Sequence, residues 1–461
     1  MKKILFLIVA FYFVNELNCL CQIPNKIKTE EKVWGLSKFW SESMYNFPYF
    51  NYLANVNFDS IYMQSIKEAI ESKNDYEYYL ALQKFAASFK DNHTYVQLPA
   101  YLNPYYTFLE FGENCFTIEQ IDGKAIITHT CVTNKEYIPV GSEIIEVDSM
   151  NVGNYLKNKI FPYLNSSSDF ALEKVGIQYL LQGLKGSSVI IKIRTTEGKI
   201  KIIELDRSDT GCEQLFPKIR RIVFYQVVEK NIALLTIDDF SDRSIVDSLI
   251  NYLPEIRKAK GLIIDIRKNG GGSSYIAKNI AQYFIEDSII YGSKGKTRKN
   301  LGYSRYWGFR IKNQTDTIGN KALAECYLMA KNLMLEDLNQ NVMKNSAKSG
   351  EKIIIPTVIL TSYMNGSASE EFLLYFENQK HIKLVGEQTS GGNGQPMTFS
   401  MPGGGIGSVC TQYCFRPDGR DYYRIGIQPD IEVSQTFQDY ISGVDAVKIR
   451  AVEYLKRIIE Y

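Results

Sequence analysis

The sequence predicts an α/β protein in three parts, with helices first, a β-rich part next and an alternating α/β part last. Apolar residues recur at helical spacing over residues 31–87 and form short strand-like runs over residues 111–207. From residue 222 onward, strand-like runs alternate with helical patterns, which predicts a mainly parallel sheet covered by helices. At 461 residues the chain is long enough for two or three domains.

The composition is that of an ordinary globular protein, with 45% hydrophobic and 23% charged residues. Lysine and arginine total 53 and aspartate and glutamate total 51, so no strong positive field favours a nucleic acid partner. The 32 tyrosines suit extended grooves that bind peptides or sugars, and they suit tyrosine-rich cores equally well.

Residues 1–21 have the pattern of a secretory signal peptide. Lys2 and Lys3 precede an apolar run over residues 4–14, and polar residues follow. Cleavage after Cys21 is expected. A lipid anchor at Cys19 or Cys21 is the alternative, although neither follows the small residue that lipidation favours. No later run has about 18 uninterrupted apolar residues, so the expected product is exported, or tethered at most, without a membrane span.

The cysteines after the signal show no CxxC spacing, which argues against a structural zinc site, and we expect no metal or cofactor. Export permits disulfides. Cys115 with Cys131 and Cys410 with Cys414 are close enough in sequence to pair, but spacing alone does not assign pairs.

An N-terminal helical module is expected over residues 30–100. It ends in the segment FKDNHTYV, where the helical period gives way to alternation and which carries His93. Histidine titrates near neutral pH, so His93 is a candidate general base; a hydrogen-bonded structural role is the alternative. His129 and His381 lie in an apolar strand and a polar turn, where a structural role is expected.

A β-rich module is expected over residues 108–208, with strands at 115–121, 125–131, 143–147, 188–194 and 200–205 and a helix at 152–164. Residues 137–152 resemble the second half of a PDZ domain. Such domains bind an extended chain end by adding it to a sheet edge. A spacer without a ligand is the alternative.

The α/β part is expected over residues 215–461. Its strand at 262–266 runs into Arg267-Lys-Asn-Gly-Gly-Gly, where glycines at a strand's carboxyl end can bring backbone N–H groups close to a ligand. No Gly-Lys-Ser or Gly-Lys-Thr follows, which argues against nucleotide binding. Residues 296–352 interrupt this part, with a helix expected at 322–335, as a groove-shaping lid or a solvated excursion.

The stretch TSYMNGSASEEF follows the apolar strand 357–360 and leads into a helix. This order exposes the Ser367 hydroxyl at a tight turn, with backbone N–H groups of the helix start nearby. Ser367 is therefore a candidate nucleophile. A serine in this position can also serve only as a helix N-cap.

Four motifs in order, IDIRKNGGG, LTSYMNGSASEEF, KLVGEQTSGG and RIGIQPDIEV, together resemble the C-terminal processing peptidases and their tricorn-type relatives. The resemblance spans about residues 33–433 and implies a serine peptidase with a ClpP/crotonase-like core. It implies that Ser367 is the nucleophile and that the N–H groups of Ala368 and Gly271 form the oxyanion hole.

The two branches of the resembled family use different catalytic bases. C-terminal processing members use a lysine in a T-F-G-K-G segment, but here the segment reads Thr389-Ser-Gly-Gly-Asn, with Gly392 at the lysine's place. Tricorn-type members use a histidine from the upstream region, which implies His93 as base.

The group that orients this histidine is less well specified. Tricorn-type relatives carry a glutamate shortly before the G-I-x-P-D motif, where this chain has Tyr423. Asp421 and Asn92 are the candidates for this role, whereas Glu370 and Glu387 match positions that resemble buried structural residues of the motifs.

Two classes of function remain open. The first is an exported peptidase that cleaves polypeptides, near C-termini or internally, through an acyl-enzyme without a cofactor. The second is a catalytically inactive relative that binds a peptide or a lipophilic molecule on the same scaffold. A glycan-handling surface protein is supported only by the tyrosine content. The sequence leaves open whether subunits assemble.

Overall fold

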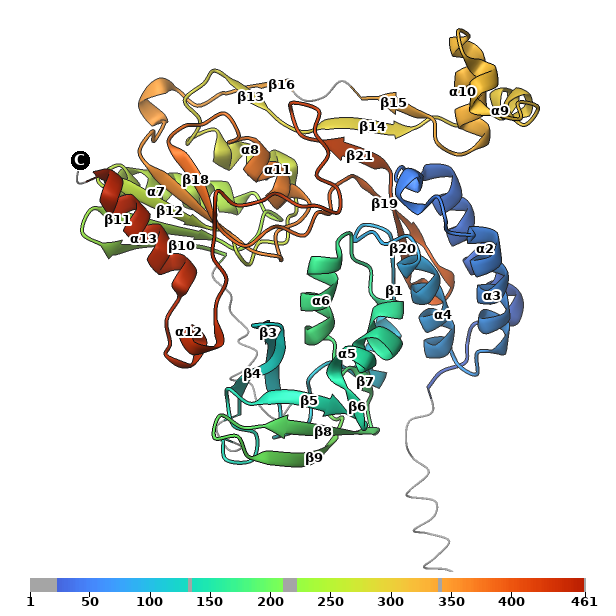
Figure 1. The fold of residues 1–461 in the computed structure, drawn as a ribbon, viewed down its shortest axis with the longest axis horizontal. Helices are drawn as coiled ribbons and strands as arrows, with labels where there is room; N and C mark the ends of the chain where they lie inside the picture. The colour runs from blue at the N-terminus through green and yellow to red at the C-terminus, as the bar shows by residue number, and fades with distance from the viewer. Residues whose placement is uncertain (1–22, 132–134, 210–221, 339–341, 460–461) are drawn as a thin grey trace, which may run out of the picture.

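Four regions make up the fold: N-terminal helices, a β-rich unit, a central sheet with its helices, and a long arm (Figure 1). The computed structural model describes residues 23–131, 135–209, 222–338 and 342–459. The predicted signal peptide, residues 1–21, and Cys212 lie outside the described residues. Within the described residues, no helix combines the length and the hydropathy needed to cross a bilayer.

The N-terminal region consists of α2 (Thr29–Asn46), η1 (Phe50–Leu53), α3 (Phe58–Glu71) and α4 (Asp75–Ala87). Asparagines cap two of these helices: the side chains of Asn57 and Asn74 accept hydrogen bonds from N–H groups of the first turns of α3 and α4. Buried aromatic rings fill the space between the helices, and several of them meet edge to face.

A hairpin from far along the chain completes this region. Strands β19 (Pro396–Ser400) and β20 (Ile406–Cys410) form an antiparallel sheet with β1 (Tyr95–Gln97), in the order β1-β20-β19. Residues of the hairpin share one apolar core with the N-terminal helices. The N-terminal helices and the C-terminal part of the chain therefore form one packed unit.

The β-rich unit is an antiparallel sheet of order β3-β4-β5-β8-β9, in which β6 also pairs with β5. Its strands are β3 (Phe116–Ile121), β4 (Lys124–Thr130), β5 (Glu143–Val147), β6 (Met150–Asn151), β8 (Ser188–Arg194) and β9 (Ile200–Asp206). The two-residue strands β2 (Tyr106–Thr107) and β7 (Gly183–Leu184) form a separate pair. The sulfurs of Cys115 and Cys131 lie 2.8 Å apart, next to β3 and β4. Cys410 Sγ instead contacts the carbonyl oxygens of Asn393 and Gln412.

Helices cover the apolar face of this sheet. The expected helix at 152–164 consists of three short pieces, α5 (Val152–Tyr155), η4 (Leu156–Ile160) and η5 (Phe161–Tyr163). The next helix, α6 (Asp169–Gln178), was not predicted, and the Ser168 side chain caps it. Helix α6 lies between the β-rich unit and the rest of the protein (Figure 1).

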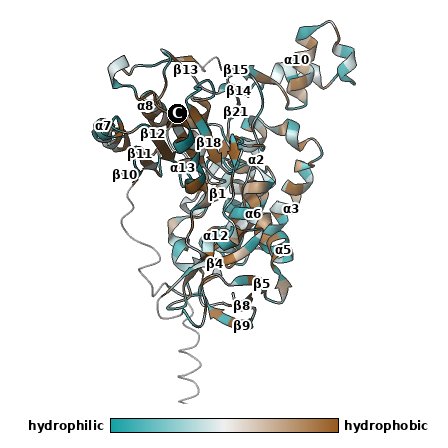
Figure 2. Ribbon diagram, turned by 60° about the vertical axis from the view of Figure 1, so that its left-hand side comes forward, coloured by the Kyte–Doolittle hydropathy of each residue, from teal (hydrophilic) through white to brown (hydrophobic). Residues whose placement is uncertain are grey.

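The central sheet has the order β10-β11-β12-β17-β18-β22. Its strands are β10 (Val223–Glu229), β11 (Ile232–Ile237), β12 (Gly261–Asp265), β17 (Thr357–Thr361), β18 (Ile382–Gly386) and β22 (Ile431–Glu432). From β11 to β22 all pairs are parallel, as predicted, whereas β10 is antiparallel to β11. Strands β11 and β12 are continuous apolar runs, coloured brown in Figure 2, as expected for strands covered on both faces.

Helices cover both faces of the central sheet. One face packs on α7 (Ser244–Ile256), α8 (Ser274–Ala281) and α11 (Ala368–Leu374), and the other packs on α13 (Ala446–Ile459). The short helix α12 (Phe437–Ile441) precedes α13. The carboxyl ends of β12 and β17 therefore lie next to each other, and each leads into a turn and a helix.

The interruption predicted at 296–352 belongs to a longer β-stranded arm, residues 289–351, that carries two helices away from the central sheet (Figure 1). It contains β13 (Ile289–Tyr291), β14 (Lys294–Arg298), α9 (Gly302–Gly308), η6 (Gln314–Thr317), α10 (Lys321–Ala330), β15 (Leu335–Asp337), β16 (Val342–Lys344) and η7 (Ser349–Glu351). Strand β14 pairs with β15 and with β21 (Gln412–Phe415), and β13 pairs with β16. The helix expected at 322–335 ends at Ala330, and Leu335 begins β15.

Candidate active site

Ser367 lies in the turn between β17 and α11, where the sequence places it. Its backbone has φ 53° and ψ −127°, a left-handed conformation that is uncommon for a residue other than glycine. The Ser367 N–H donates to Gly392 O at 2.7 Å, which anchors the turn to the loop after β18. The side chain is half-buried, so a substrate can reach its hydroxyl.

His93 lies beside this serine although 274 residues separate them in the chain, and Nε2 is 3.1 Å from Ser367 Oγ. The side chain is 8% exposed. A hydrogen bond from Ser408 Oγ in β20 to the backbone carbonyl oxygen of His93, at 2.8 Å, holds the turn around the histidine. The distance is within the range for proton transfer between a nucleophile and a base. Nδ1 is buried and has no hydrogen-bond partner among the described residues.

Asp91 supplies the buried negative charge next to His93. One carboxylate oxygen, Oδ2, accepts from the His93 N–H at 3.1 Å and from Thr94 Oγ1 at 2.7 Å. Burial lowers the pKa of His93, and the negative charge of Asp91 opposes this by raising it. Conversely, burial raises the pKa of Asp91, and the proximity of His93 lowers it. The carboxylate acts on the imidazole through space, since no hydrogen bond joins Asp91 to Nδ1 in the described structure.

The residues named as orienting candidates lie elsewhere. Asp421 accepts from the hydroxyls of Tyr52 and Tyr413 and from the Tyr423 N–H, so its carboxylate is engaged in a tyrosine cluster. The Asn92 side chain accepts from Ser167 Oγ at 3.1 Å. In the described structure neither side chain is hydrogen-bonded to His93.

Glu370 and Glu387 also have other partners, as expected for structural residues. Glu370 is fully buried, and its Oε1 accepts from Thr389 Oγ1 at 2.5 Å and from the Gly391 N–H at 2.8 Å. Burial is the main cause that raises the pKa of Glu370 to about 7. Glu387 forms an ion pair with Lys174 of α6 at 2.8 Å.

Tyr423 occupies the position expected for a glutamate, and it contacts Asp91 rather than His93. Its hydroxyl is 3.4 Å from Asp91 Oδ1, and its ring stacks on Tyr49 with centroids 3.5 Å apart. An apolar, buried ring here leaves Asp91 as the acid whose charge reaches the imidazole. Sequence reasoning missed Asp91, although its signal was present as an acid two residues before the histidine.

The two predicted oxyanion donors lie around Ser367. Ala368 is the first residue of α11, so its N–H has no acceptor within the helix and is available to a ligand. Gly271 lies against the nucleophile: a Cβ atom there would be 2.9 Å from Ser367 Cβ, and its φ of 113° favours glycine. The Gly271 N–H, however, donates to Asn269 Oδ1 at 2.9 Å. To bind an oxyanion it would have to leave that acceptor.

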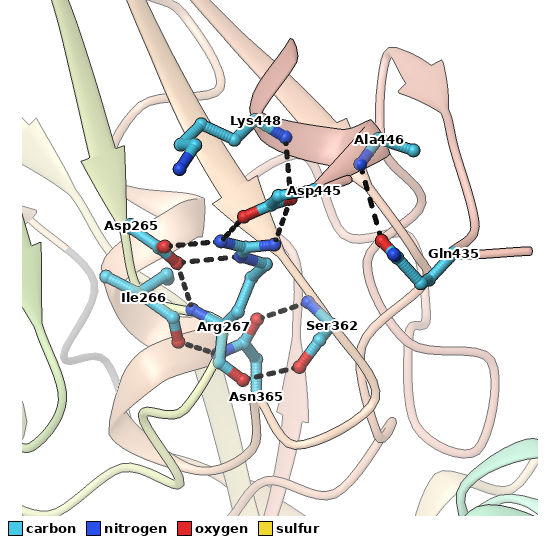
Figure 3. Close-up of polar contacts among 9 residues, drawn as sticks. All are labelled: Asp265, Ile266, Arg267, Ser362, Asn365, Gln435, Asp445, Ala446 and Lys448. Carbon is cyan, nitrogen blue, oxygen red and sulfur yellow. Dashed lines mark hydrogen bonds and ion pairs between the residues drawn. The ribbon is translucent and has the colours of Figure 1, made fainter. Parts of the chain in front are cut away.

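Buried amides fix the turn after β12 to the turn that holds Ser367. Asn365 Nδ2 donates to Ile266 O at 2.6 Å, and Ser362 Oγ donates to Arg267 O at 2.5 Å (Figure 3). Asn365 Nδ2 also donates to Asn269 O at 3.0 Å. On the other side of this turn, the Arg267 guanidinium is held by Asp265 and Asp445 (Figure 3). The strained nucleophile turn is therefore supported from the neighbouring strand.

The β-rich unit also contacts the site, which no local sequence signal indicated. Ser167 Oγ accepts from the Asn92 N–H at 3.1 Å, Ser168 Oγ donates to Ser390 O at 2.7 Å, and Asn165 Nδ2 donates to Thr94 O at 2.6 Å. Residues 165–168 therefore connect the histidine turn to the loop at 389–392. Within the described residues no group of histidines, cysteines and carboxylates is arranged to hold a metal ion.

Comparison with known proteins finds a family model that matches part of the chain. Residues 231–433 match Peptidase family S41. The carboxy-terminal processing protease CtpA of Bacillus subtilis is 24% identical over 274 residues, which are 58% of this chain and 50% of CtpA. The tail-specific protease of Haemophilus influenzae is 34% identical over 113 residues, which are 24% of this chain and 16% of that protein. The chain thus matches half or less of the length of these relatives.

Solved structures resemble the fold over almost the whole chain. The crystal structure of mature CPAF has a TM-score of 0.68 at 15% identity and covers 94% of this chain and 96% of that chain. A putative peptidase from Parabacteroides merdae has a TM-score of 0.50 at 17% identity and covers 93% of this chain and 96% of that chain. At these identities the likeness concerns the mixed α/β fold alone.

Proposed function

We propose that this protein is a serine peptidase that hydrolyses peptide bonds with Ser367 as nucleophile and His93 as general base, because residues 231–433 match Peptidase family S41. The observation that carries the proposal is the distance of 3.1 Å between His93 Nε2 and Ser367 Oγ. The family's shared core motifs supply Ser367, whereas His93 comes from a region outside the matched residues.

In the first step His93 takes the Ser367 proton while Oγ attacks the scissile carbonyl carbon. The carbonyl oxygen becomes an oxyanion, which the Ala368 N–H can bind, joined by Gly271 if its N–H turns from Asn269. Removing one such donor from other serine peptidases costs about 3 kcal/mol in barrier. The imidazolium then gives its proton to the leaving amine. In the second step His93 takes a proton from water, which attacks the acyl group, and the proton returns to Ser367 Oγ as the acid is released.

Asp91 has the role of a positioning residue in this mechanism. The buried carboxylate favours the imidazolium that forms in the transition state, because opposite charges attract strongly where water is excluded. It also fixes the backbone of the base through the His93 N–H. No glutamate from the segment before Gly426 is then required.

The proposed substrate is a polypeptide. The relatives named for carboxy-terminal processing and tail specificity suggest cleavage near a C-terminus. We propose that the central sheet is a ClpP/crotonase-like core, that residues 108–208 form a PDZ-like module which binds an extended peptide, and that the protein acts after export. The contacts of residues 165–168 with the histidine turn support a module that works together with the site.

The second candidate function is peptide or lipophile binding without catalysis. Two observations favour it: the internal hydrogen bond of the Gly271 N–H and the unpartnered Nδ1 of His93. Both observations concern the protein without a substrate. Hydrogen bonds of an active site often reach their final alignment only when the substrate is bound. We therefore rank the peptidase first.

Labelling with a fluorophosphonate probe tests the proposal. The wild-type protein should be labelled, and Ser367→Ala and His93→Ala should not be, because an unactivated serine does not react with the probe. His129→Ala and Lys383→Ala are matched controls, since His129 lies on β4 and Lys383 pairs with Asp430 at the surface. Full labelling of Ser367→Ala, or loss of labelling in Lys383→Ala, would overturn the assignment.

A further inference from the structure

Three side chains at the junction of β14 and α9 present buried donors without acceptors. Arg298 Nε and Nη1, Asn300 Nδ2 and Arg305 Nε are buried, and none has a hydrogen-bond partner among the described residues. Buried donors in proteins are almost always paired, because leaving one unpaired costs about 1–3 kcal/mol. These unpaired donors indicate that an acceptor outside the described residues can bind here.

These donors belong to one short stretch of the arm, residues 298–305. Arg298 is the last residue of β14, and the next residue continues the pairing with β15, since the Lys299 N–H donates to Met334 O at 3.1 Å. Asn300 lies two residues beyond Arg298, in the segment between β14 and α9. Arg305 follows on α9.

Both guanidinium groups lie against the N-terminal helical region. Arg298 is 5.3 Å from the ring centroid of Phe50, and Arg305 is 5.8 Å from that of Tyr45. Figure 1 shows the arm with α9 passing above α2. As whole residues, both arginines are only half-buried.

Charge balance distinguishes these arginines from their neighbours. Lys296 pairs with Asp337 and Lys299 pairs with Glu336, each at 3.5 Å. By contrast, no acidic partner of Arg298 or Arg305 occurs among the described residues. Burial, together with the positive charge of Arg305, lowers the pKa of Arg298 to about 10. Two like charges near each other and partly removed from water are unfavourable until an anion binds.

We propose that Arg298, Asn300 and Arg305 form a binding site for a phosphate group. The planar fork of each guanidinium matches the oxygens of a phosphate, and two positive charges match a dianionic phosphate better than a single carboxylate. The phosphate can come from free solute or from a phosphomonoester headgroup at a bilayer surface. Exposed aromatic side chains of and beside α9 provide apolar contact for the second source: Tyr303, Trp307 and Phe309.

Calorimetric titration of the purified protein with inorganic phosphate, against chloride at equal ionic strength, tests the site. Wild type should bind saturably. Arg298→Met and Arg305→Met should each weaken binding by about tenfold or more, the value of a charged hydrogen bond. Arg310→Met is the matched control, because this exposed arginine of the arm stacks on Tyr306 at 3.9 Å, outside the cluster. Equal affinity of wild type and Arg298→Met would overturn the proposal, as would the absence of both saturable phosphate binding and vesicle binding that depends on phosphatidic acid.

Thermal unfolding tests whether a variant loses phosphate binding only because it is no longer folded. Without phosphate, Arg298→Met should unfold at the wild-type temperature or above it, because the substitution removes a partly buried, unpaired charge. With phosphate, the wild type and Arg310→Met should gain stability, whereas Arg298→Met should not. Phosphate stabilisation of Arg298→Met equal to that of wild type would count against the site. Ser367→Ala should behave as wild type, so the outcome does not depend on the proposed peptidase activity.

Sedimentation with phosphatidylcholine vesicles, with and without phosphatidic acid, distinguishes the two sources. Binding that requires phosphatidic acid and is lost in Arg298→Met identifies a headgroup, whereas binding of free phosphate alone identifies a solute; both support the site. Vesicle binding that Arg298→Met leaves unchanged, together with no binding of free phosphate, would refute it.

Discussion

The side chain of Asn92 fills the space into which a Cβ atom at Gly392 would project, with its amide atoms 2.2 Å from that point. Position 392 is where C-terminal processing members carry their catalytic lysine, according to the resemblance of the sequence. A lysine at this position would collide with the residue beside His93. In this chain the observed position of the Asn92 side chain and any side chain at position 392 therefore exclude each other by sterics.

Gly392→Ala should impair the site, because the added methyl group would collide with the Asn92 side chain. The collision must displace either the Asn92 side chain or the loop that accepts the Ser367 N–H, and overpacking of this kind costs about 1–3 kcal/mol. We expect a lower kcat/KM and a lower Tm. Asn92→Gly in the same chain should restore part of both by making room. A fully active and stable Gly392→Ala protein would contradict the steric argument.

Asp91→Asn should change the pH dependence of the proposed peptidase. His93 must be neutral to act as a base, and because burial lowers its pKa, activity should persist below the usual histidine range around 6.5. Removing the negative charge of Asp91 lowers the pKa of His93 further, so the acid limb of kcat/KM should move to lower pH.

The same variant should lower the plateau of kcat by about tenfold to a hundredfold, because the imidazolium loses its counter-charge in the transition state. Asparagine can still accept the hydrogen bonds from Thr94 and from the His93 N–H, so the fold should be retained. An unchanged profile would assign Asp91 a purely structural role. The measurement is kcat and kcat/KM against pH, with Tm as the check on folding.

Glu370 should make folding stability depend on pH. The pKa of its carboxyl rises from 4.5 to about 7 because it is buried. Between these pH values the folded protein holds a proton that the unfolded chain has released. The contribution of Glu370 to the free energy of unfolding is therefore complete below pH 4.5 and is lost as the pH rises through 7. The free energy of unfolding should change by about 3 kcal/mol over this range.

Glu370→Gln should remove this dependence while keeping an acceptor for Thr389 and Gly391. Chemical denaturation across this pH range, compared between wild type and the variant, gives the difference directly. Parallel curves for the two proteins would mean that Glu370 is charged in the folded state.

The ion pair of Lys174 and Glu387 should couple the β-rich unit to the catalytic region. Their side chains are 11% and 16% exposed, and the Lys174 Nζ also lies 5.1 Å from the ring centroid of Tyr363, in the stretch that leads to Ser367. Lys174→Met should accelerate hydrogen exchange in α6 and slow the labelling of Ser367. A double-mutant cycle with Glu387→Gln should give a coupling of about 1–3 kcal/mol.

Lys192→Met is the matched control for this experiment, because Lys192 pairs with Glu146 within the β-rich unit and at its surface. It should leave both the exchange of α6 and the labelling of Ser367 unchanged. If both lysine variants had the same effect, the contact between the units would not be specific to Lys174.

Local patterns in the sequence determined the elements that carry the reactive groups. The apolar run, the small residues of the turn and the helix after them identified the strand–turn–helix at Ser367, and the glycines after residue 266 identified the neighbouring turn. The parallel order of β11, β12, β17 and β18 also followed from the alternation. Such features depend on a few adjacent residues, through turn conformation and periodicity.

Tertiary structure alone decided which distant residues meet. It brought His93 to Ser367 across 274 residues, joined the hairpin at 396–410 to the N-terminal helices, and assigned Asp91 rather than Asp421 to the surroundings of the base. It also left Arg298 and Arg305 without an acidic partner within the described residues. These outcomes rest on packing and electrostatics between segments far apart in the chain, which no local window of sequence contains.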